Sequence, residues 1–577
     1  MQTVDFTALT AACTGVRDRW IPARIEQVYQ RDRYTIAMAL RTLKLRGWLT
    51  ICWHPQAARI CIGDAPPRTP DTFTFSDQLR HQLAGFALIA IEAIAPWERV
   101  LDLQFAKRPG DSPIWHLYVE IMGKYSNVIL TDAKNQIVTV AHQVSTAQSS
   151  IRTVQTGQPY TLPPALTNPT PNLRESQQRW QERVSLIPGA ISRQLLKSYR
   201  GLSPSLARSM VQAANLDPEQ SSESLEESDW QGLFQRWQEW LQAIETSNFN
   251  PGWTADGYTV LGWGIAKPVE NVQTLLNRYY TDELNQQFFQ QLRHQLVQKI
   301  SNLLAKLRLK ADTFKQRLQQ SDRADEYRRQ ADLLMAHLPD WEPGMKSITL
   351  SDFETGKPIK ILLNPEKNAV QNAQALYKRH QKLKRARTAV EPLLQEVLSE
   401  IEYLEQVEAT LNQLEGYDHP EDLQTLEEIR EELIQQKYLE AKQQRHRSTA
   451  QESKPYRYKT PSGFELWIGR NNRQNDRLTF RTAGDYDLWF HTQEIAGSHV
   501  LLRLKPGSVP EQADLQFAAD LAAYYSKARQ GEQAPVVYTE PKYVYKPRGA
   551  KPGMAIYKRE RLLWGRPQRA KLYLSKK

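Results

Sequence analysis

The sequence predicts an α+β protein of several domains joined by a long helical arm. The chain has 577 residues, which at roughly 100 to 200 residues per domain implies about three to five folding units. Short strand-like runs alternate with amphipathic helical runs near both ends of the chain. The middle of the chain instead has apolar residues at heptad spacing, which is typical of long paired helices.

Four regions differ in pattern, and we expect each to be a separate part of the fold. They are an α+β domain at 1–175, short helices with a return strand at 176–265, a helical arm at 266–450 with a β insertion at about 335–365, and a second α+β domain at 452–577.

The first region combines both periodicities and ends in the Pro-rich segment PYTLPPALTNPTPN, which indicates a linker. In the second region we expect a helix, a tight turn and a helix that Ser203 or Ser205 caps. The strand-like run YTVLGWG follows, and we expect it to return to the sheet of the first domain. The first region's strand-like runs are 47–54, 100–105, 114–121 and 127–132, and its helical runs are 4–16 and 76–86.

The arm has two apolar stripes that should pair. Their members are Leu296, Ile300, Leu303, Leu307, Ala311, Phe314 and Leu318 on the first helix, and Leu376, Leu383, Val390, Val397, Leu404 and Leu411 on the second. We expect a helical hairpin in which the two stripes bury each other, and the pattern leaves a parallel dimer open as the alternative.

Glycine, asparagine and proline residues predict where the arm turns, where its second helix begins and where that helix bends. Two alternating segments flank Gly356 and indicate a small β-hairpin. Asn364 as a cap and Pro365 at the first helical position predict the start of the second helix. Pro392 lies inside the heptad repeat and should kink that helix.

The positive charge of the protein is concentrated at one end. The formal net charge is +11, and residues 455–577 alone hold 22 Lys+Arg against 11 Asp+Glu, a difference of +11. From Lys542 to Lys577 there are 12 bases and one acid. Such a field on one domain indicates a polyanionic partner, most often nucleic acid.

Cysteine content and hydropathy predict a soluble, cytoplasmic protein. The three cysteines, Cys13, Cys52 and Cys61, are too few for a disulfide framework or a four-Cys zinc site. The start of the sequence lacks the pattern of a signal peptide. The most apolar run, FALIAIEAIAPW, has 12 residues and contains Glu92, so no membrane span is predicted.

The common enzyme motifs do not occur in the sequence. It contains no phosphate loop, dinucleotide fingerprint, His-Glu-x-x-His pattern or nucleophile elbow. His491, Ser498 and His499 suggest a metal site or a nucleophile at first sight. Since no third ligand or orienting acid accompanies them, we prefer the interpretation that they hold a loop or meet a phosphate. We therefore predict no catalytic residue, metal or cofactor.

Two strings in the last region favour contact with RNA over an ordinary charged surface. GRNNRQNDRLTF concentrates forked donors and amides, which suit phosphate oxygens and unpaired base edges. KYVYKPRGAKPG interleaves Lys542, Lys546, Arg548 and Lys551 with two tyrosines, so that bases can take phosphates while the aromatic rings stack.

Two strings stand out in the first region. Glu98 and Arg99 are adjacent just before a predicted strand, and EIMGKYSNVIL surrounds a turn at Gly123. Adjacent side chains on a strand point to opposite faces, so we expect Arg99 to engage a partner other than Glu98.

Seven motifs in order give the sequence a family resemblance. HPQAAR, EIMGKYSNVIL, RTVQTGQPYTLPP, NPEKNAVQNAQALYKRHQKLKRA, GRNNRQNDRLTF, DLWFHTQEIAGSHV and KYVYKPRGAKPG extend over nearly its full length, from about Phe6 to about Trp564. This sequence resembles the NFACT family, whose bacterial members have the older name of fibronectin-binding proteins.

The resemblance implies an architecture and a function. It implies a glycosylase-like NFACT-N domain, a helix-hairpin-helix domain, an antiparallel coiled-coil arm and an NFACT-R RNA-binding domain. It further implies a monomeric ribosome quality-control factor that binds large ribosomal subunits obstructed by peptidyl-tRNA. Such a factor recruits elongator tRNA, expected to be tRNA-Ala, and promotes untemplated alanine tailing of the stalled polypeptide. The ribosome performs the peptidyl transfer, so the factor is expected not to be an enzyme.

The resemblance also implies site residues. Glu98 and Arg99 match the family's Asp-Arg pair for tRNA selection, with Glu in place of Asp, and Glu120, Ile121 and Met122 match its Glu-Ile-Met string. The residues predicted to contact RNA or the ribosome are Arg470, Asn471, Asn475, Asp476, Trp489, His491, Ser498, His499, Lys542, Lys546, Arg548 and Lys551.

Two alternatives remain at this point. A DNA-binding protein of the glycosylase class would need a proline amine at position 2 and a neighbouring Glu, where this sequence has Gln2 and Thr3. A surface fibronectin-binding adhesin would need a route of export that the sequence does not suggest.

Overall fold

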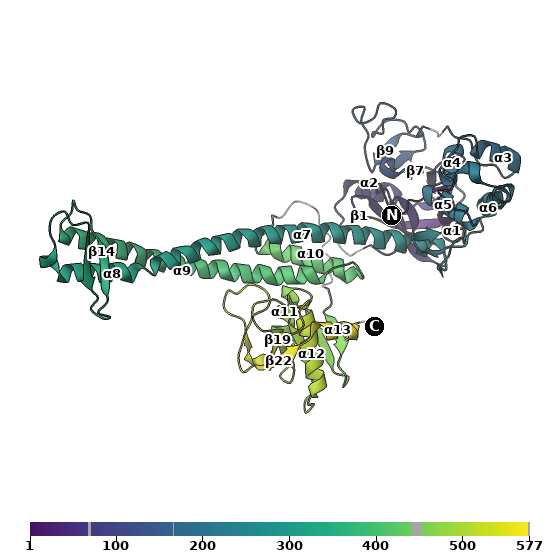
Figure 1. The fold of residues 1–577 in the computed structure, drawn as a ribbon. Coiled ribbons are helices and arrows are strands. Elements are labelled where there is room, and N and C mark those ends of the chain that lie inside the picture. Colours follow the sequence, from purple (N-terminus) through teal and green to yellow (C-terminus); the bar gives the residue numbers. More distant parts are fainter. Residues whose placement is uncertain (67–70, 165–166, 441–452, 575–577) are drawn as a thin grey trace. The chain divides into compact units, whose positions relative to one another are not determined.

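The computed structural model describes residues 1–66, 71–164, 167–440 and 453–574 (Figure 1). These residues form two compact units, one of residues 1–286 and one of residues 287–440 with 453–574. Both units mix helices and sheets, as the sequence predicts. None of the described helices combines the length and the apolar content that crossing a bilayer requires.

A nine-stranded antiparallel sheet is the base of the first unit. Its strands lie in the order β4-β3-β2-β1-β5-β6-β7-β8-β9. α1 (Phe6–Trp20), α2 (Thr74–Leu83) and the first turns of α7 (Val272–Ser321) bury apolar side chains in this unit. The strands are β1 (Ala23–Asp32), β2 (Thr35–Arg41), β3 (Arg46–Cys52), β4 (Arg59–Gly63), β5 (Ala87–Ala93), β6 (Val100–Ala106), β7 (Trp115–Glu120), β8 (Asn127–Asp132) and β9 (Ile137–Val140).

Four helices with a tryptophan-rich core complete most of the first unit. They are α3 (Gln177–Val184), α4 (Ile191–Ser198), α5 (Pro204–Ala213) and α6 (Glu227–Thr246). The α4–α5 turn passes through Gly201 at a φ of 87°, a conformation that glycine adopts without strain. Ser203 caps α5, because its hydroxyl accepts the backbone N–H of Leu206. The buried rings are Trp180, Trp230, Trp237 and Trp240.

The predicted return strand does not join the large sheet. Residues 257–259 form β11 (Gly257–Thr259), which pairs with β10 (Gly252–Thr254), and β10 also pairs with β12 (Lys267–Pro268). The tight turn after Thr254 brings β10 and β11 together locally, so the expectation of a return to the first sheet was wrong.

The arm is a helical hairpin within one polypeptide, as its two stripes predict. α7 packs along α9 (Ala369–Gln413), and α10 (Pro420–Gln435) joins the same core near the base of the arm. At the tip, α8 (Ala324–Ala336) covers the predicted hairpin of β13 (Ser347–Ser351) and β14 (Pro358–Leu362).

The second helix of the arm begins later than predicted and continues through Pro392. Asn368, not Asn364, is its cap, and it accepts the backbone N–H of Gln371 at 2.8 Å while the Gln371 side chain bonds back to it. Asn364 lies in a preceding turn, where its backbone binds the side chain of Asn372. The reciprocal capping box explains why the later start is preferred.

The C-terminal domain is a six-stranded sheet in the order β15-β16-β18-β17-β19-β22, and α12 and α13 cover one of its faces. The predicted hairpin around Ser462 and Gly463 is present as β15 and β16. The elements are β15 (Tyr456–Lys459), β16 (Glu465–Ile468), α11 (Asn472–Arg477), β17 (Leu488–Thr492), β18 (Val500–Arg503), α12 (Gln512–Tyr524), β19 (Ala534–Thr539), β20 (Val544–Tyr545), β21 (Ile556–Tyr557), β22 (Arg561–Gly565) and α13 (Pro567–Leu574).

Two glycines make a matched test of this packing. A Cβ on Gly565 would overlap the carbonyl oxygen of Ala519 in α12 and lie 2.8 Å from the Cβ of Ala523. Gly565→Ala should therefore lower the free energy of unfolding of the C-terminal domain by about 1 to 3 kcal/mol. Gly232→Ala, in α6 with nothing within 4 Å of the new methyl, should raise stability by about 0.5 to 1 kcal/mol. Calorimetry of the full-length protein would contradict the packing if Gly565→Ala had no effect.

Candidate nucleic-acid contact sites

The turn before β6 sets the direction of the first candidate residues. Trp97 has a φ of 64°, which is a strained conformation for a large side chain. Its ring packs on Phe6 and Trp240 at centroid distances of 4.7 and 5.4 Å, and glycine at position 201 leaves room for it. These contacts hold the turn and fix the backbone of the two residues that follow.

The side chains of Glu98 and Arg99 extend from this turn toward different partners. Glu98 forms an ion pair with Arg200 at 3.3 Å, in the α4–α5 turn. Arg99 donates from Nη1 to the carbonyl oxygen of Val4 at 3.0 Å. Burial lowers the pKa of Arg99, and the nearby charges of Asp5 and Glu98 oppose that shift. The Arg99 guanidinium is therefore partly desolvated.

Arg99 lies on the wall of a pocket of about 180 Å³. β7 ends at this pocket, and the backbone N–H of Ile121 donates to the Arg99 carbonyl oxygen at 2.9 Å. The pocket offers one guanidinium beside apolar walls, which suits a single planar polar group. Its lining residues are Thr3, Val4, Pro55, Gln56, Ala58, Arg99, Ile121, Met122 and Gly123.

Glu120 does not belong to this pocket. It is 2% exposed, accepts two hydrogen bonds from Arg152 at 3.0 and 2.6 Å, and accepts a third from the Tyr160 hydroxyl at 2.9 Å. Its carboxylate tethers the segment that contains Arg152 and Tyr160 to the sheet. Of the five residues predicted in this domain, the structure therefore brings Arg99, Ile121 and Met122 together and directs Glu98 and Glu120 elsewhere.

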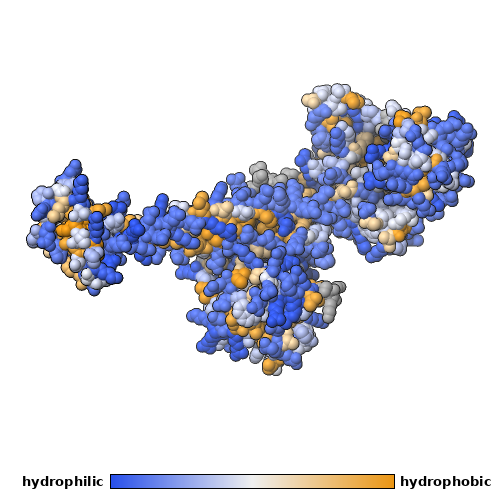
Figure 2. All heavy atoms as spheres, viewed as in Figure 1, coloured by the Kyte–Doolittle hydropathy of each residue, from blue (hydrophilic) through white to orange (hydrophobic). Residues whose placement is uncertain are grey.

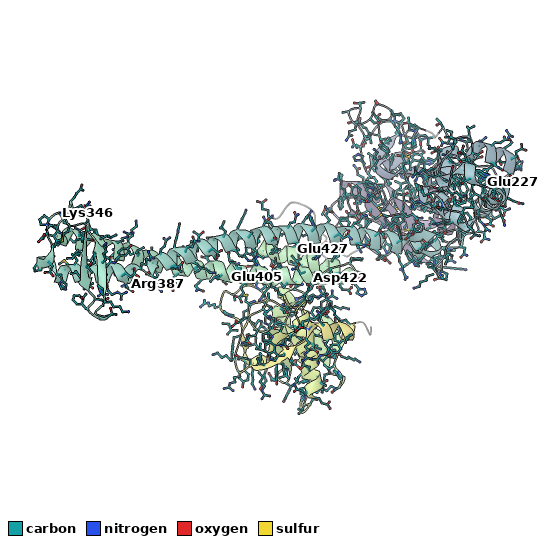
Figure 3. The ribbon with its side chains drawn as sticks, viewed as in Figure 1. Glu227, Lys346, Arg387, Glu405, Asp422 and Glu427 are labelled. Atoms are coloured by element: carbon teal, nitrogen blue, oxygen red, sulfur yellow. The ribbon has the colours of Figure 1, made fainter. Side chains whose placement is uncertain are left out.

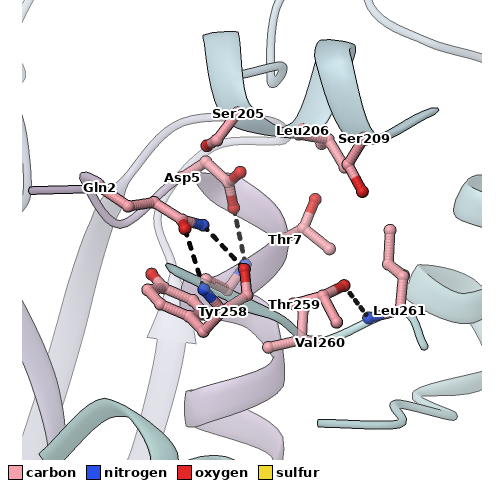
Figure 4. Close-up of a pocket in the computed structure, with 11 residues that line it drawn as sticks. Gln2, Asp5, Thr7, Ser205, Leu206, Ser209, Tyr258, Thr259, Val260 and Leu261 are labelled. Atoms are coloured by element: carbon pink, nitrogen blue, oxygen red, sulfur yellow. Dashed lines mark hydrogen bonds between the residues drawn. The ribbon is translucent and has the colours of Figure 1, made fainter. Parts of the chain in front are cut away.

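A smaller cavity lined by Gln2, Asp5 and Tyr258, among others, shows how the N-terminal segment is anchored (Figure 4). Its volume is about 40 Å³, close to the size of a water site rather than a ligand site. Asp5 caps α1 through the N–H of Ala8 at 2.8 Å and accepts the Ser203 hydroxyl at 2.7 Å. Gln2 exchanges side-chain hydrogen bonds with the backbone of Tyr258. The segment in which Val4 meets Arg99 is thereby fixed at both ends.

The polar loop of the C-terminal domain is buried against the arm. Asn471, Asn472, Gln474 and Asn475 are each at most 5% exposed. The inner arm, residues 392–440, has 14 Asp+Glu against two Lys+Arg. Because buried carboxylates need partners, the two sequences complement each other.

Side-chain contacts with carboxylates of the inner arm join it to this domain. Burial raises the pKa of Glu432, whereas the hydrogen bonds that its carboxylate accepts from Tyr403 and Asn472 lower it. In the structure, therefore, Arg470 and Asn471 meet carboxylates of the arm and not solvent. The contacts are Arg470–Asp422 (2.9 Å), Asn471–Glu428 (2.6 Å), Asn472–Glu432 (3.2 Å), Arg473–Glu431 (3.7 Å), Lys527–Glu405 (3.5 Å), Arg529–Glu415 (3.4 Å) and Lys551–Glu400 (3.7 Å).

The predicted aromatic and histidine residues form an internal hydrogen-bond network. Trp489 donates to the Thr479 hydroxyl at 3.0 Å, which lies 2.6 Å from His499 Nδ1, and His499 Nε2 donates to the Gly553 carbonyl at 3.2 Å. These partners assign His499 one neutral tautomer. Burial lowers the pKa of His499 to about 3 and that of His491 to about 4.

Other predicted residues of this domain also have partners within it. The backbone N–H of Ser498 donates to the Tyr525 carbonyl, and Asn475 Oδ1 accepts the N–H of His499 at 3.1 Å. Asp476 accepts the N–H of Gly553 at 3.0 Å and forms an ion pair with Lys546. Asp476 of the polar loop therefore holds the loop at 551–553 in place.

The exposed positive charge lies on the last strands. Lys542 is exposed and pairs with Glu540 at 2.5 Å, and Arg548 is exposed. β22 is an edge strand that no sequence motif marks, and on it Leu562 and Trp564 are each 51% exposed and point to the same side. The ratio of 12 bases to one acid was the signal for this surface. Its exposed bases are Lys558, Arg559, Arg561 and Arg566.

Comparisons with known proteins identify the family. A family model described as NFACT N-terminal and middle domains matches residues 5–452, and one described as NFACT protein RNA binding domain matches 454–558. Over 552 residues, 94% of the length of each protein, the sequence is 31% identical to the Rqc2 homolog RqcH of Bacillus subtilis. The chain belongs to the NFACT family.

A further relative of this NFACT protein has the same name. The Rqc2 homolog RqcH of Streptococcus pneumoniae is 29% identical over 571 residues, which is 97% of the length of each protein. A solved structure of the C-terminal part of the fibronectin/fibrinogen-binding protein from Streptococcus suis aligns at 31% identity and a TM-score of 0.38, over 49% of this protein and 98% of that structure. β22 and its exposed Trp564 lie beyond the residues that the RNA-binding model matches.

The buried histidines of the NFACT-R domain predict a pH dependence. Because the folded-state pKa values lie below the usual 6.5, the unfolded state binds protons first as the pH falls. The stability that the two neutral histidines contribute should be fully present above about pH 6.5. It should be lost as the pH falls from there toward the folded-state pKa values of about 4 and about 3. His499→Gln keeps a donor for Gly553 without a titrating ring, so its stability should depend less on pH.

Hydrogen exchange of the NFACT-R domain between pH 4.5 and 7 measures this effect. His294→Gln, at an exposed position of the arm, is the matched control and should retain the full pH dependence. An unchanged pH dependence in His499→Gln would contradict the internal role of this ring.

Proposed function

We propose that this NFACT protein is a ribosome-associated quality-control factor that contacts RNA through its C-terminal domain. The observation that carries the proposal is the exposed surface of Lys558, Arg559, Arg561, Trp564 and Arg566 on a domain of net charge +11. Cations take phosphates and an exposed indole can stack on an unpaired base. The relatives' name, Rqc2 homolog RqcH, supports the same role.

The partner is a large ribosomal subunit that still holds peptidyl-tRNA. The first unit then recruits an elongator tRNA, and the Arg99 pocket accepts one nucleotide of it. Arg99 supplies a fixed cation, while Met122 and Ile121 supply apolar contact for the base. We assign alanine tRNA as the cargo and untemplated tailing as the outcome, with the ribosome as the catalyst of peptidyl transfer.

The structure favours this role over DNA glycosylase chemistry. That chemistry needs a free N-terminal amine aimed into a substrate pocket. Here the backbone N–H of Gln2 donates to the Tyr279 hydroxyl at 2.8 Å, and the Tyr280 hydroxyl donates to the Gln2 carbonyl at 2.8 Å. Position 2 is thus a structural anchor.

Arg99 is the first test of the proposal. Arg99→Ala should abolish tailing of stalled nascent polypeptides and leave co-sedimentation with obstructed large subunits largely intact, because the exposed charge of the NFACT-R domain is untouched. Mass spectrometry of the released polypeptides measures the tails at their C-termini. Arg19→Ala, at an exposed site of the same unit, is the control. Equal loss of tailing and subunit binding would show that Arg99 has a general structural role.

The β22 surface is the second test. Arg561→Gln with Arg566→Gln should weaken binding to single-stranded RNA and reduce the slope of log affinity against log salt by about 1.4, which is about 0.7 for each lost phosphate contact. Trp564→Ala should weaken binding and leave the salt slope unchanged, since stacking is not ionic. Fluorescence anisotropy at several salt concentrations separates these effects. The same slope for all variants would contradict the assignment.

A further inference from the structure

A cavity of about 500 Å³ lies between the base of the arm and the C-terminal domain, within the second unit. Figure 3 places Asp422, one of its lining residues, where the arm approaches that domain. On the face shown in Figure 2, the inner arm and the domain form one continuous surface. A volume of this size is typical of sites that enclose a small molecule. The cavity is separate from the Arg99 pocket and from β22, so the function proposed above does not use it.

The charged side chains that line the cavity balance one another. Three arginines and three acidic residues line it. A ligand with charge of only one sign would meet side chains of its own sign there, which costs affinity. The lining therefore suits a ligand with an anionic group at one end and N–H donors at the other. The charged residues are Arg457, Arg470, Arg529, Glu415, Asp418 and Asp422.

Two of these arginines lie over tyrosine rings. The Arg470 guanidinium lies 3.8 Å from the ring centroid of Tyr456, and the Arg529 guanidinium lies 4.4 Å from that of Tyr524. Tyr456 also contacts Tyr525, at a centroid distance of 5.0 Å. Contacts of this kind hold a flexible cation in one place and fix the direction of its donors. The cavity thus combines positioned cations with aromatic rings, which suit a phosphate and a planar base.

Two buried donors of the lining residues lack an acceptor among the described residues. They are Nε of Arg470 and Nε2 of Gln413. Gln413 ends α9, whereas Arg470 follows β16, so the two donors come from the arm and from the domain. A buried donor without an acceptor is destabilising. A ligand oxygen in the cavity would supply the missing acceptor.

Arg529 can bind a ligand without the loss of a buried ion pair. Its pair with Glu415 is 3.4 Å long, and the Glu415 side chain is 67% exposed. Exposed pairs contribute little, because water and salt screen them. Two other contacts hold the Arg529 guanidinium in place, with the Tyr524 hydroxyl at 2.6 Å and the Gln413 carbonyl at 3.4 Å. The charge of Arg529 is therefore positioned but only partly neutralised.

We propose that this cavity binds a nucleoside monophosphate. The phosphate carries nearly two negative charges at neutral pH, and it accepts hydrogen bonds from Arg470, Arg529 and the Gln413 amide. The base stacks on the tyrosine rings. Asp418 is exposed at the cavity and accepts from the amino group of the base. Each of the two kinds of group in the lining thereby has a counterpart in the ligand.

A free nucleotide fits the cavity better than an RNA chain does. The inner arm has two bases and 14 acids, a net charge of 2 − 14 = −12. An RNA chain would bring further phosphates on both sides of the bound nucleotide, and the acids of the arm would repel them. A monophosphate brings its charge only to the arginines. The inference thus goes beyond the proposed function and does not depend on it.

Calorimetric titration of the full-length protein with AMP and with GMP tests the site. Each should bind with a Kd below about 1 mM. Adenosine and inorganic phosphate each have half of the ligand, so each should bind at least about tenfold more weakly. The proposal would be overturned if neither nucleotide bound, or if phosphate bound as tightly as AMP. Phenylalanine that bound more tightly than AMP would make the cavity an amino-acid site, and the proposal would be wrong.

Gln413→Leu and Gln424→Leu are a matched pair of variants. Each removes a buried amide whose Nε2 lacks an acceptor among the described residues, but only Gln413 lines the cavity. Gln413→Leu should raise the Kd for AMP at least about tenfold and leave the Tm of the free protein no lower, because the lost donor had no partner. Gln424→Leu should change the Kd less than about twofold. Equal affinities in the two variants would overturn the site.

Arg529→Gln is a second variant that tests the orientation of the ligand. It should raise the Kd for AMP at least about tenfold and leave that for adenosine unchanged, because adenosine has no phosphate for the guanidinium. The difference in affinity between AMP and adenosine should therefore nearly disappear. An undiminished difference would contradict the phosphate site and overturn the proposal.

Hydrogen exchange locates the bound nucleotide. AMP should slow amide exchange in residues 413–422 and 524–529 and leave the exchange of β22 unchanged. Protection of β22 without protection of 413–422 would place AMP on the surface assigned to RNA, so this inference would fail while the proposed function stood. Protection at the cavity in a protein that does not bind RNA would have the opposite meaning.

Discussion

The pairing of the acidic inner arm with the C-terminal domain is the constraint from which the rest of the second unit follows. Arg470 and Asp422 are each only 10% exposed as side chains, and losing one member of such a buried pair typically costs about 3 to 5 kcal/mol. The carboxylates of α10 therefore require the donors of the polar loop, and the loop requires them. This mutual need removes Arg470, Asn471 and Asn472 from the set of groups that face solvent. Exposed cations of this domain remain on β22, where they can meet another molecule.

In the first unit, too, the charged side chains near the candidate site have partners within the same unit. Asp5 caps α1, accepts the Ser203 hydroxyl at the start of α5, and lies near enough to Arg99 to oppose the effect of burial on its pKa. Burial nevertheless raises the pKa of Asp5 itself, so the carboxylate is kept there by its hydrogen bonds and not by solvation. Glu98 and Arg200 tie the same turn to the helices. These charges thus have partners within the unit, while Arg99 is directed to the pocket wall.

The sequence predicts elements that depend on local pattern and misses those that depend on distant pairing. Heptad spacing predicted the helical hairpin because α7 and α9 bury their own stripes, and Gly356 and Gly463 marked hairpins that the backbone requires. The second helix of the arm was predicted to begin at Asn364 because Pro365 follows it at the first helical position. Asn368 has the same cap chemistry, and the reciprocal bond with Gln371 distinguishes it. The polar loop was predicted to contact RNA because its forked donors and amides suit phosphate oxygens and base edges. Its partner, α10, precedes it by about 40 residues, and nothing local shows that Glu428 and Asn471 meet.

The net charge of residues 1–454 does not describe how charge is distributed along the arm. The net charge of residues 1–454 is zero whether the charges are mixed or segregated, yet the electric fields differ. The field of mixed charges cancels within a few ångströms. The field of a block of like charges extends over about a Debye length, roughly 8 Å at physiological salt. α9 has both signs along one continuous helix, so the division between Arg387 and Glu396 is fixed by the helix itself. Part of the acidic side pairs with cations of the NFACT-R domain, while Glu396 and Glu402 stay exposed. On the basic side the partners are local, as in the pair of Arg387 with Asp322, and the helix holds its cations at constant spacing. The arm therefore presents a basic segment and an acidic segment to solvent, each held at a fixed spacing by the helix that contains it.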